Sequence, residues 1–255
     1  MDLFFPVFCV GCQREGKYLC KRCSEFLGEA SLICPVCEES SFTGERHVSC
    51  STLYGLDGLV AVWEYEGVIK QLLLRIKYGG IGHATQETME LAFLAIAQDT
   101  ARFSQFLSFL LEKETVLTFV PMWKRKERKR GYNQALLIAQ ALGTIISSST
   151  DSSTGSSTSF SCAKTPQQFL QKTKDTKSQT ELARIERLSN VKDSFAIVQE
   201  SSNSEFPLRF TPTLSSSVVL VDDVWTTGAT MKECCKVLKK AGVEKVWGFV
   251  LARTV

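Results

Sequence analysis

Short apolar runs alternate along the chain with stretches in which apolar residues recur at helical spacing. Residues 218–221 are apolar throughout, as in a strand that is buried on both faces of a parallel sheet. Residues 59–63, 116–120 and 245–251 form similar runs. After the run at residues 218–221, apolar residues recur at helical spacing over residues 231–238. This alternation predicts an α/β fold with an open, mostly parallel sheet and helices on both faces.

The other elements are predicted from apolar stripes and from the residues that end them. A stripe over residues 69–76 predicts a helix that stops at Lys77-Tyr78-Gly79-Gly80, which we interpret as a helix C-cap in preference to a ligand contact. Helical sequence continues to about residue 114, and another amphipathic helix begins near Gly131. A short helix over residues 182–188 and an edge strand over residues 195–198 complete the prediction.

Two Ser-rich stretches interrupt this pattern. Residues 147–161 contain twelve Ser or Thr among fifteen positions, and residues 201–217 form a second stretch of this kind. Such segments bury too little apolar surface to offset the entropy lost on ordering. We therefore expect flexible insertions in a single domain rather than a domain boundary.

Length and composition set the scale of the protein. With 255 residues, of which 44% are hydrophobic, the chain has room for one domain of ordinary size and a smaller one. A net charge of +3 is too small to indicate nucleic-acid binding by itself. Charged and polar residues interrupt the apolar stretch 91–111, and the apolar residues 1–8 lack the basic start of a secretory signal. We expect a cytoplasmic protein without a membrane span.

Cysteines are concentrated at the start of the chain. Seven of the ten lie before residue 51, in Cys-x-x-Cys pairs and in one His-x-x-Cys pair, a spacing that favours metal over disulfides. These pairs supply the eight ligands that two tetrahedral Zn²⁺ sites need. The ligands are Cys9, Cys12, Cys20, Cys23, Cys34, Cys37, His47 and Cys50.

The spacing leaves the pairing of these ligands open. Sequential pairing gives a Cys₄ site and a Cys₃His site, and a cross-braced pairing fits the sequence equally well. The alternatives are a single occupied zinc with leftover thiols, or buried free cysteines. The segment has few apolar residues for a core, so metal binding would provide most of its folding free energy. We predict a zinc-ribbon domain at residues 1–53 and a larger domain at residues 54–255.

The richest stretch of functional residues follows the strand at 218–221. Two carboxylates come first, then a loop of hydroxyl-bearing residues, then the start of a helix. Hydroxyls, free backbone N–H groups and a helix N-terminus suit a phosphate monoester, and the carboxylates suit ribose hydroxyls or hydrated Mg²⁺. The predicted site residues are Asp222 and Asp223 with the loop residues Thr226, Thr227, Gly228, Ala229 and Thr230.

A second candidate is the basic run at residues 124–130, which follows the strand 116–120 and Pro121. Ligands of open α/β sheets bind beyond the carboxyl ends of the strands, which is where this basic loop is expected. An anion site is therefore at least as well supported as a solvated charged face. We name Arg125, Arg128 and Arg130 as candidates for binding the anionic group.

These motifs carry a resemblance to known proteins. The stretch 222–230 resembles the phosphoribosyl-pyrophosphate signature of type I phosphoribosyltransferases, and the chain as a whole resembles the ComF family. ComF proteins combine an N-terminal zinc ribbon with such a domain and are associated with DNA uptake in competent bacteria. The other matching residues are the Cys-x-x-Cys pairs, 77–80, 120–121, Arg130-Gly131-Tyr132-Asn133-Gln134-Ala135, Thr176 with Gln179, Glu186-Arg187 and Asn190-Val191. The chain departs from the family at Met122-Trp123-Lys124 and in its longer Ser-rich stretches.

The resemblance implies binding of phosphoribosyl pyrophosphate with Mg²⁺. The acidic pair would hold the ribose, the hydroxyl-rich loop the 5-phosphate and the arginines the pyrophosphate, while residues 162–190 would form a lid. Transfer of the phosphoribosyl group to an acceptor would follow, but the sequence does not identify the acceptor. The alternative is a non-catalytic module that binds single-stranded DNA or a competence helicase through the zinc ribbon and the basic loop, with Trp123 and Tyr132 available for base stacking.

Overall fold

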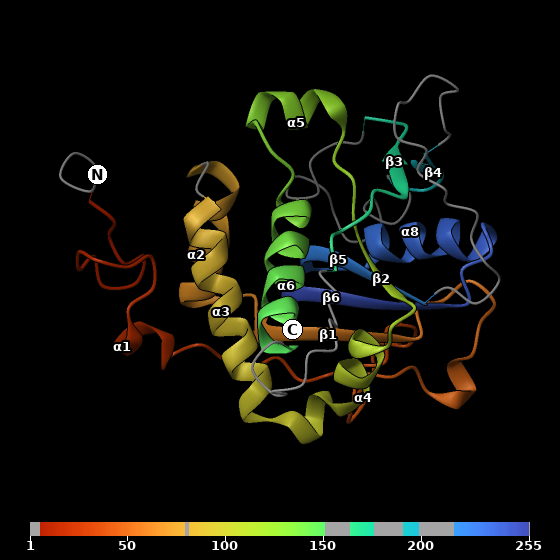
Figure 1. Ribbon diagram of the computed structural model, residues 1–255, viewed down its shortest axis with the longest axis horizontal. Coiled ribbons are helices and arrows are strands. Elements are labelled where there is room, and N and C mark those ends of the chain that lie inside the picture. The colour runs from red at the N-terminus through yellow and green to blue at the C-terminus, as the bar shows by residue number, and fades with distance from the viewer. Residues whose placement is uncertain (1–5, 80–81, 151–163, 176–190, 199–216, 255) are drawn as a thin grey trace, which may run out of the picture.

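The computed structural model of the chain describes all residues except 1–5, 80–81, 151–163, 176–190, 199–216 and 255. Its centre is a four-stranded parallel sheet with the strand order β1-β6-β5-β2 (Figure 1). The predicted open parallel sheet is thereby confirmed. The strands are β1 (Gly58–Glu64), β6 (Lys245–Arg253), β5 (Ser217–Trp225) and β2 (Thr115–Phe119).

Helices cover both faces of this sheet. On β6, the ring of Phe249 stacks on Phe106 of α4, with centroids 5.6 Å apart, whereas a Cβ atom at Gly248 would meet Met231 of α8. Neighbouring residues of a strand point to opposite faces, so α4 and α8 lie on opposite sides of the sheet. Two-sided burial explains why the strand sequences lack polar alternation. The helices of the two layers are α2 (Gly67–Gly79), α3 (Gly82–Gln98), α4 (Thr100–Leu111), α6 (Gln134–Thr150) and α8 (Ala229–Lys240).

The segment that follows α6 runs along the outer edge of β2. The backbone N–H of Gln167 donates to the carbonyl oxygen of Leu117 at 2.9 Å, and Thr118 Oγ1 donates to the carbonyl of Gln167 at 2.8 Å. Lys164, which is 8% exposed, anchors this segment beside the end of α4. Its ammonium group donates to three carbonyl groups, those of Leu110, Glu112 and Thr115.

The cysteine-rich segment packs along the free edge of β1. Isolated bridges join Glu29 to Trp63 and Glu45 to Gly58, and the N–H of Ala30 donates to the carbonyl of Val62 at 3.1 Å. Apolar residues of this segment belong to the same core cluster as the sheet. The segment contains the short helices α1 (Lys21–Ser24) and η1 (Val48–Cys50). The boundary after residue 53 stays a prediction.

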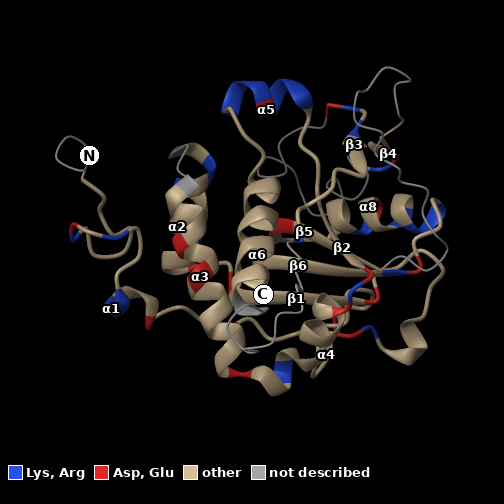
Figure 2. Cartoon of the chain, viewed as in Figure 1, with Lys and Arg blue, Asp and Glu red and all other residues tan. Residues whose placement is uncertain are grey.

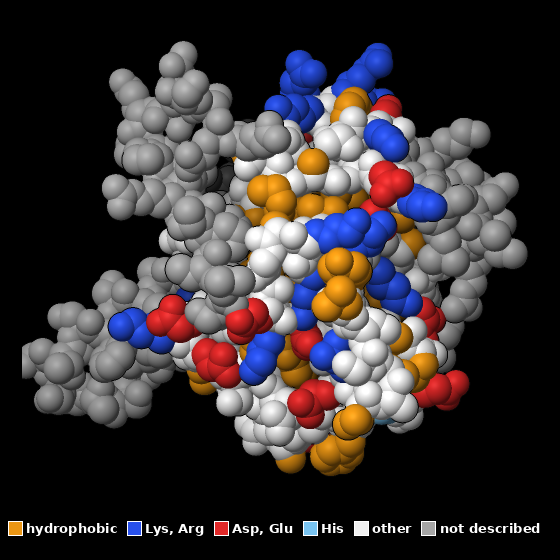
Figure 3. Space-filling model, turned by 90° about the vertical axis from the view of Figure 1, so that its right-hand side faces the viewer, with side chains coloured by type: hydrophobic (Ala, Val, Ile, Leu, Met, Phe, Trp, Pro, Cys, Tyr) orange, Lys and Arg blue, Asp and Glu red, His pale blue; other side chains and the backbone are white. Residues whose placement is uncertain are grey.

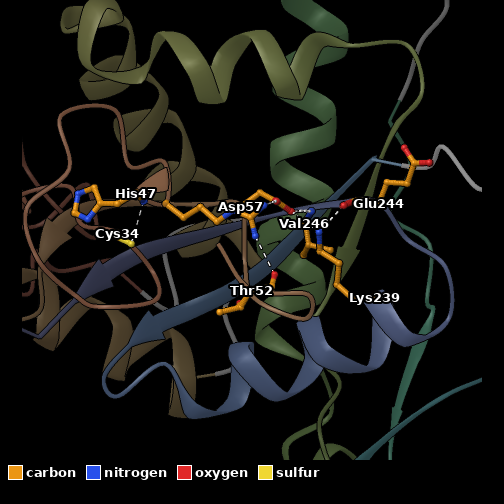
Figure 4. Close-up of polar contacts among 8 residues, drawn as sticks. Cys34, His47, Thr52, Asp57, Lys239, Glu244 and Val246 are labelled. Atoms are coloured by element: carbon orange, nitrogen blue, oxygen red, sulfur yellow. Dashed lines mark hydrogen bonds and ion pairs between the residues drawn. The ribbon is translucent and has the colours of Figure 1, made fainter. Parts of the chain in front are cut away.

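Asp57 lies at the junction between the cysteine-rich segment and the sheet (Figure 4). Its Oδ2 accepts hydrogen bonds from Lys239 Nζ at 2.7 Å and from the backbone N–H of Val246 at 2.8 Å. Its Oδ1 pairs with the guanidinium of Arg46, 3.1 Å away, and Arg46 directly precedes His47. One carboxylate therefore connects the segment next to His47, the end of α8 and the start of β6.

Three predicted boundaries were wrong. Residues 124–130 form the helix α5 (Lys124–Arg130) rather than a loop, because Lys, Arg and Glu favour helix and Gly131, with φ of 89°, closes it. Helix α6 extends to Thr150, into the Ser-rich stretch, where Ser147 Oγ donates to the carbonyl of Gly143. Strand β5 does not stop at the acidic pair but continues to Trp225, since pairing with β6 persists.

The edge strand expected at 195–198 is present. It is β4 (Phe195–Ile197), which pairs antiparallel with β3 (Leu170–Lys172) next to α8. The rest of the predicted insertions, the helix at 182–188 and the greater part of the predicted lid, including Thr176 and Gln179, lie outside the described residues. Within the described ranges, no helix is long and apolar enough to cross a bilayer.

Candidate functional site

A pocket of about 340 Å³ opens at the carboxyl ends of β2 and β5, where α6 and α8 begin. Ligands of open α/β sheets bind at this edge, so the position agrees with the sequence-based expectation. The volume falls in the range of small-molecule sites, about 300–1,000 Å³. Its polar lining combines both carboxylates, four cationic side chains and part of the loop before α8. These residues are Asp222, Asp223, Lys77, Lys126, Arg130, Lys172, Thr226, Gly228 and Thr230.

The loop between β5 and α8 is shaped by Gly228. This residue has a φ of 66° and precedes the first residue of α8. The left-handed conformation turns the chain from strand to helix within three residues, so the N-terminus of α8 faces the pocket. Thr227 is buried and lies outside the pocket lining, and its Oγ1 accepts a hydrogen bond from the N–H of Ala229 at 3.4 Å. Thr227 therefore folds the loop, while its neighbours line the pocket.

The neighbouring carboxylates Asp222 and Asp223 repel each other, which disfavours the ionised form of Asp222. Burial, followed by repulsion from the neighbouring Asp223, raises the pKa of Asp222 well above the ordinary value for aspartate. The N–H of Asp223 donates to Asp222 Oδ1 at 2.9 Å, and the N–H of Val224 donates to Asp223 Oδ1 at 2.8 Å. A cation or a set of ligand hydroxyls placed between these groups would favour the ionised pair.

The opposite wall of the pocket is basic. Figure 2 shows the blue helix α5 above the acidic end of β5, and Figure 3 shows its Lys and Arg side chains gathered at the same end of the molecule. Of the three predicted arginines, Arg130 lines the pocket, whereas Arg125 and Arg128 are exposed and do not. Helix geometry explains this selection, because residues of α5 on its outer side point to solvent.

Sequence reasoning missed three residues of the pocket. Lys172 reaches it from β3, and burial, followed by the nearby charge of Lys126, lowers the pKa of its amine. Gln134 lines the pocket although only 3% of its surface is exposed. Lys77 and Tyr78, near the end of α2, also line it, although this stretch was interpreted as a helix C-cap in preference to a ligand contact. The motif Gly131-Tyr132-Asn133-Gln134-Ala135 was a signal for Gln134, but no pattern in the sequence marked Lys172.

The cysteine-rich segment contains two clusters of four metal-binding groups each. The ligand atoms within each cluster lie within 4.8 Å of one another. A tetrahedral zinc with bonds of about 2.3 Å places sulfur atoms about 3.8 Å apart, close to the 3.6 Å between Cys12 Sγ and Cys20 Sγ. The clusters pair the ligands sequentially, so the cross-braced alternative is wrong. They are Cys9, Cys12, Cys20 and Cys23, and Cys34, Cys37, His47 and Cys50.

Hydrogen bonds to the ligand side chains orient them for metal binding in both clusters. His47 Nδ1 lies 3.4 Å from Cys37 Sγ, while its Nε2 lies 3.1 Å from the carbonyl of Ser40, which fixes Nδ1 as the free ligand atom. The N–H of Cys20 donates to Cys9 Sγ at 3.4 Å. Burial alone would raise the pKa of the Cys9 thiol, but hydrogen bonds from backbone N–H groups, Cys20 first, lower it to about 6. Both tetrads are consistent with structural zinc.

Parts of this chain are similar to a known domain and to several known proteins. Residues 163–254 match the model of the phosphoribosyl transferase domain. The chain is 28% identical to Competence protein F of Haemophilus influenzae, a match that covers 96% of this chain and 90% of that protein. It is also 26% identical to Competence protein ComFC of Bacillus subtilis over 76% of this chain and 63% of that protein.

Over most of its length, the chain is similar to proteins named for competence. A further relative is the DNA utilization protein YhgH of Escherichia coli, which is 24% identical over 97% of this chain and 89% of its own length. The chain has a phosphoribosyl transferase domain built on an open parallel sheet, together with a cysteine-rich N-terminal region suited to zinc. The matched residues 163–254 include β5, the loop before α8 and α8 itself.

Proposed function

We propose that this protein binds phosphoribosyl pyrophosphate with Mg²⁺ in the pocket at the ends of β2 and β5. The observation that supports this most is the combination in one pocket of a phosphate-type loop, an acidic pair and a basic wall. A ligand with a phosphate at one end, a sugar in the middle and a diphosphate at the other matches that order of groups.

We further propose that the bound phosphoribosyl group is transferred to an acceptor. Departure of pyrophosphate builds positive charge at ribose C1 and negative charge on the leaving group. In this proposal Arg130, Lys126 and Lys172 stabilise the leaving group, while Asp222 and Asp223 hold the ribose hydroxyls and the Mg²⁺ that accompanies the ligand. The names of the relatives support an activity connected with competence and DNA utilization.

Isothermal titration with phosphoribosyl pyrophosphate and Mg²⁺ tests the proposal. We expect saturable heat for the wild type and a loss of affinity of at least tenfold when Asp222 and Asp223 are both changed to Ala. The exposed pair Glu112 and Glu114, changed to Ala, serves as a control of equal charge loss after α4, away from the pocket, and should titrate as the wild type does. Equal heats for the wild type and the Asp222 and Asp223 variant would contradict the assignment.

The DNA-binding alternative stays a prediction. Arg125 and Arg128 on α5 are exposed and do not line the pocket, which leaves them available to a polyanion. An absence of wild-type heat with the sugar phosphate, combined with salt-dependent binding of single-stranded DNA, would favour that alternative.

Binding of the Mg²⁺ complex is expected to strengthen as the pH rises. Asp222 has a raised pKa in the unliganded protein, so its contribution to stability is present below the ordinary aspartate pKa of about 3.9 and is lost as the pH rises through the raised value. Ligand binding requires the ionised carboxylate and therefore releases a proton. Titrations in buffers of different ionisation enthalpy should detect this release, and the Asp222→Asn variant should not show it. A wild-type affinity that is independent of pH would contradict the role of Asp222.

A further inference from the structure

Gln134 presents a hydrogen-bond donor that has no partner among the described residues. It is the first residue of α6, it is 3% exposed, and it lines the pocket. Its Nε2 atom is buried and makes no hydrogen bond in the part of the chain that the structure describes. A buried amide left without a partner costs about 1–3 kcal/mol, so such a group is seldom kept without a reason.

The orientation of this amide is fixed by Arg130. Arg130 Nη1 donates a hydrogen bond to Gln134 Oε1 at 2.9 Å. A guanidinium group has donors only, so the atom that faces it must be the carbonyl oxygen of the amide, and the NH₂ group lies on the other side. The guanidinium in turn lies over the ring of Tyr78, 5.7 Å from its centroid.

Asn133 makes the neighbouring backbone equally rigid. Its Nδ2 donates at 3.1 Å to the carbonyl of Val120, which directly follows β2, and its Oδ1 accepts from the N–H of Ala135 at 3.0 Å. These bonds tie the start of α6 to the sheet. The hydrogen bonds of Asn133 fix the backbone on both sides of Gln134, and Arg130 fixes its side-chain carbonyl oxygen. Its NH₂ group has no hydrogen-bond partner among the described residues.

The surroundings of the NH₂ group select the kind of acceptor. The N-terminus of α6 carries partial positive charge, and Lys77, Lys126 and Lys172 line the same pocket. The carboxylates of β5 line the same pocket. An acceptor in such a field is an anionic oxygen, and a ligand that places its 5-phosphate on the loop before α8 extends its other end toward α6.

We propose that Gln134 is a ligand-binding residue whose Nε2 donates a hydrogen bond to a phosphoryl oxygen of the diphosphate end of the ligand. This inference rests on the proposed function, because it assumes a ligand of the phosphoribosyl pyrophosphate type. Gln134 distinguishes that ligand from ribose 5-phosphate, which has the same phosphate and sugar but lacks the diphosphate. The residue thus contributes selectivity for the diphosphate form without adding charge.

Two substitutions at this position test the inference. Gln134→Glu keeps the shape of the side chain and its bond with Arg130, but it replaces the donor by a carboxylate oxygen. Gln134→Met keeps the approximate volume and removes both polar atoms. Gln140→Glu, on the exposed side of the same helix, is the matched control for the change of charge.

Titrations are performed with phosphoribosyl pyrophosphate and with ribose 5-phosphate, each with Mg²⁺. We expect Gln134→Glu and Gln134→Met to weaken the affinity for phosphoribosyl pyrophosphate by at least tenfold, and the affinity for ribose 5-phosphate by less than twofold. Gln140→Glu should change neither. A merely structural role would lower both affinities together, and that result would overturn the inference.

The outcomes separate this inference from the proposed function. If the wild type binds phosphoribosyl pyrophosphate and both Gln134 variants bind it equally well, the role of Gln134 is wrong and the proposed function stands. If the wild type binds neither ligand, the proposed function itself is wrong, and the inference about Gln134 is overturned with it.

Discussion

Gly228→Ala is expected to abolish measurable binding of phosphoribosyl pyrophosphate, with a loss of affinity of at least a hundredfold. A Cβ atom at this position would lie 2.1 Å from Cζ2 of Trp225, far inside contact distance. Trp225 cannot yield, because it is 2% exposed and Lys232 Nζ lies 5.2 Å from its ring centroid. The loop before α8 would have to move, and the positive φ of 66° adds a cost of about 1–2 kcal/mol for alanine.

Gly67→Ala is a matched control for the strain of positive φ alone. Gly67 has a φ of 48°, and a Cβ atom there would meet nothing within 4 Å. We expect that variant to lose about 1–2 kcal/mol of unfolding free energy and to keep its ligand affinity. Titration calorimetry and urea unfolding check both variants, and a Gly228→Ala protein that binds as the wild type does would show that the loop is not the phosphate site.

Asp57→Ala is expected to lower the free energy of unfolding by about 3–5 kcal/mol. The change leaves Lys239, whose side chain is only 8% exposed, without its carboxylate partner, and it removes the acceptor of the Val246 N–H. Arg46, which connects this carboxylate to the neighbourhood of His47, also loses its partner. Urea unfolding followed by tryptophan fluorescence measures the loss, since Trp247 lies on the strand that Asp57 holds.

Glu29→Ala provides the comparison for this prediction. Glu29 pairs with Arg102 at 3.0 Å, but its side chain is 66% exposed. Exposed pairs contribute about 0–1 kcal/mol, so this variant should unfold almost as the wild type does. If both variants lost the same stability, the carboxylate of Asp57 would not be the special link between the cysteine-rich segment and the sheet.

The Asp57 junction is also connected to the helix that follows the loop at residues 226–228. Lys232, in the first turn of α8, pairs with Glu38 at 2.7 Å, next to the metal-binding residue Cys37, and Lys239 near the other end of α8 pairs with Asp57. The second metal tetrad is thus attached to both ends of the helix whose N-terminus faces the pocket. A metal at that tetrad would be expected to support the shape of the ligand site.

Several features were predictable because they depend on neighbours in the sequence. The buried strands are continuous apolar runs, and the acidic pair with its glycine-containing loop lies within nine consecutive residues, 222–230. The ligand types of the cysteine pairs follow from Cys-x-x-Cys spacing alone. Such features depend on residues that are close in the sequence, so they can be predicted without the tertiary structure.

Other features failed or were missed because they depend on packing between distant segments. The basic run is a helix, and the direction of its residues, rather than their charge, brings Arg130 to the pocket and leaves Arg125 and Arg128 in solvent. Lys172 reaches the pocket only because β3 pairs with β4 beside α8. A single sequence does not show which distant segments pack together or which way their side chains point.

The alternation of strands and helices, the eight metal-binding groups and the loop that begins α8 are thus encoded in short contiguous stretches of residues. Three other features depend on the folded arrangement: which cysteines share a tetrad, which cations line the pocket of the acidic pair, and how Arg130 holds the amide of Gln134, whose NH₂ group is unpaired among the described residues. Pairing, burial and unsatisfied donors arise only when residues from distant parts of the chain come together, so contiguous sequence does not reveal them.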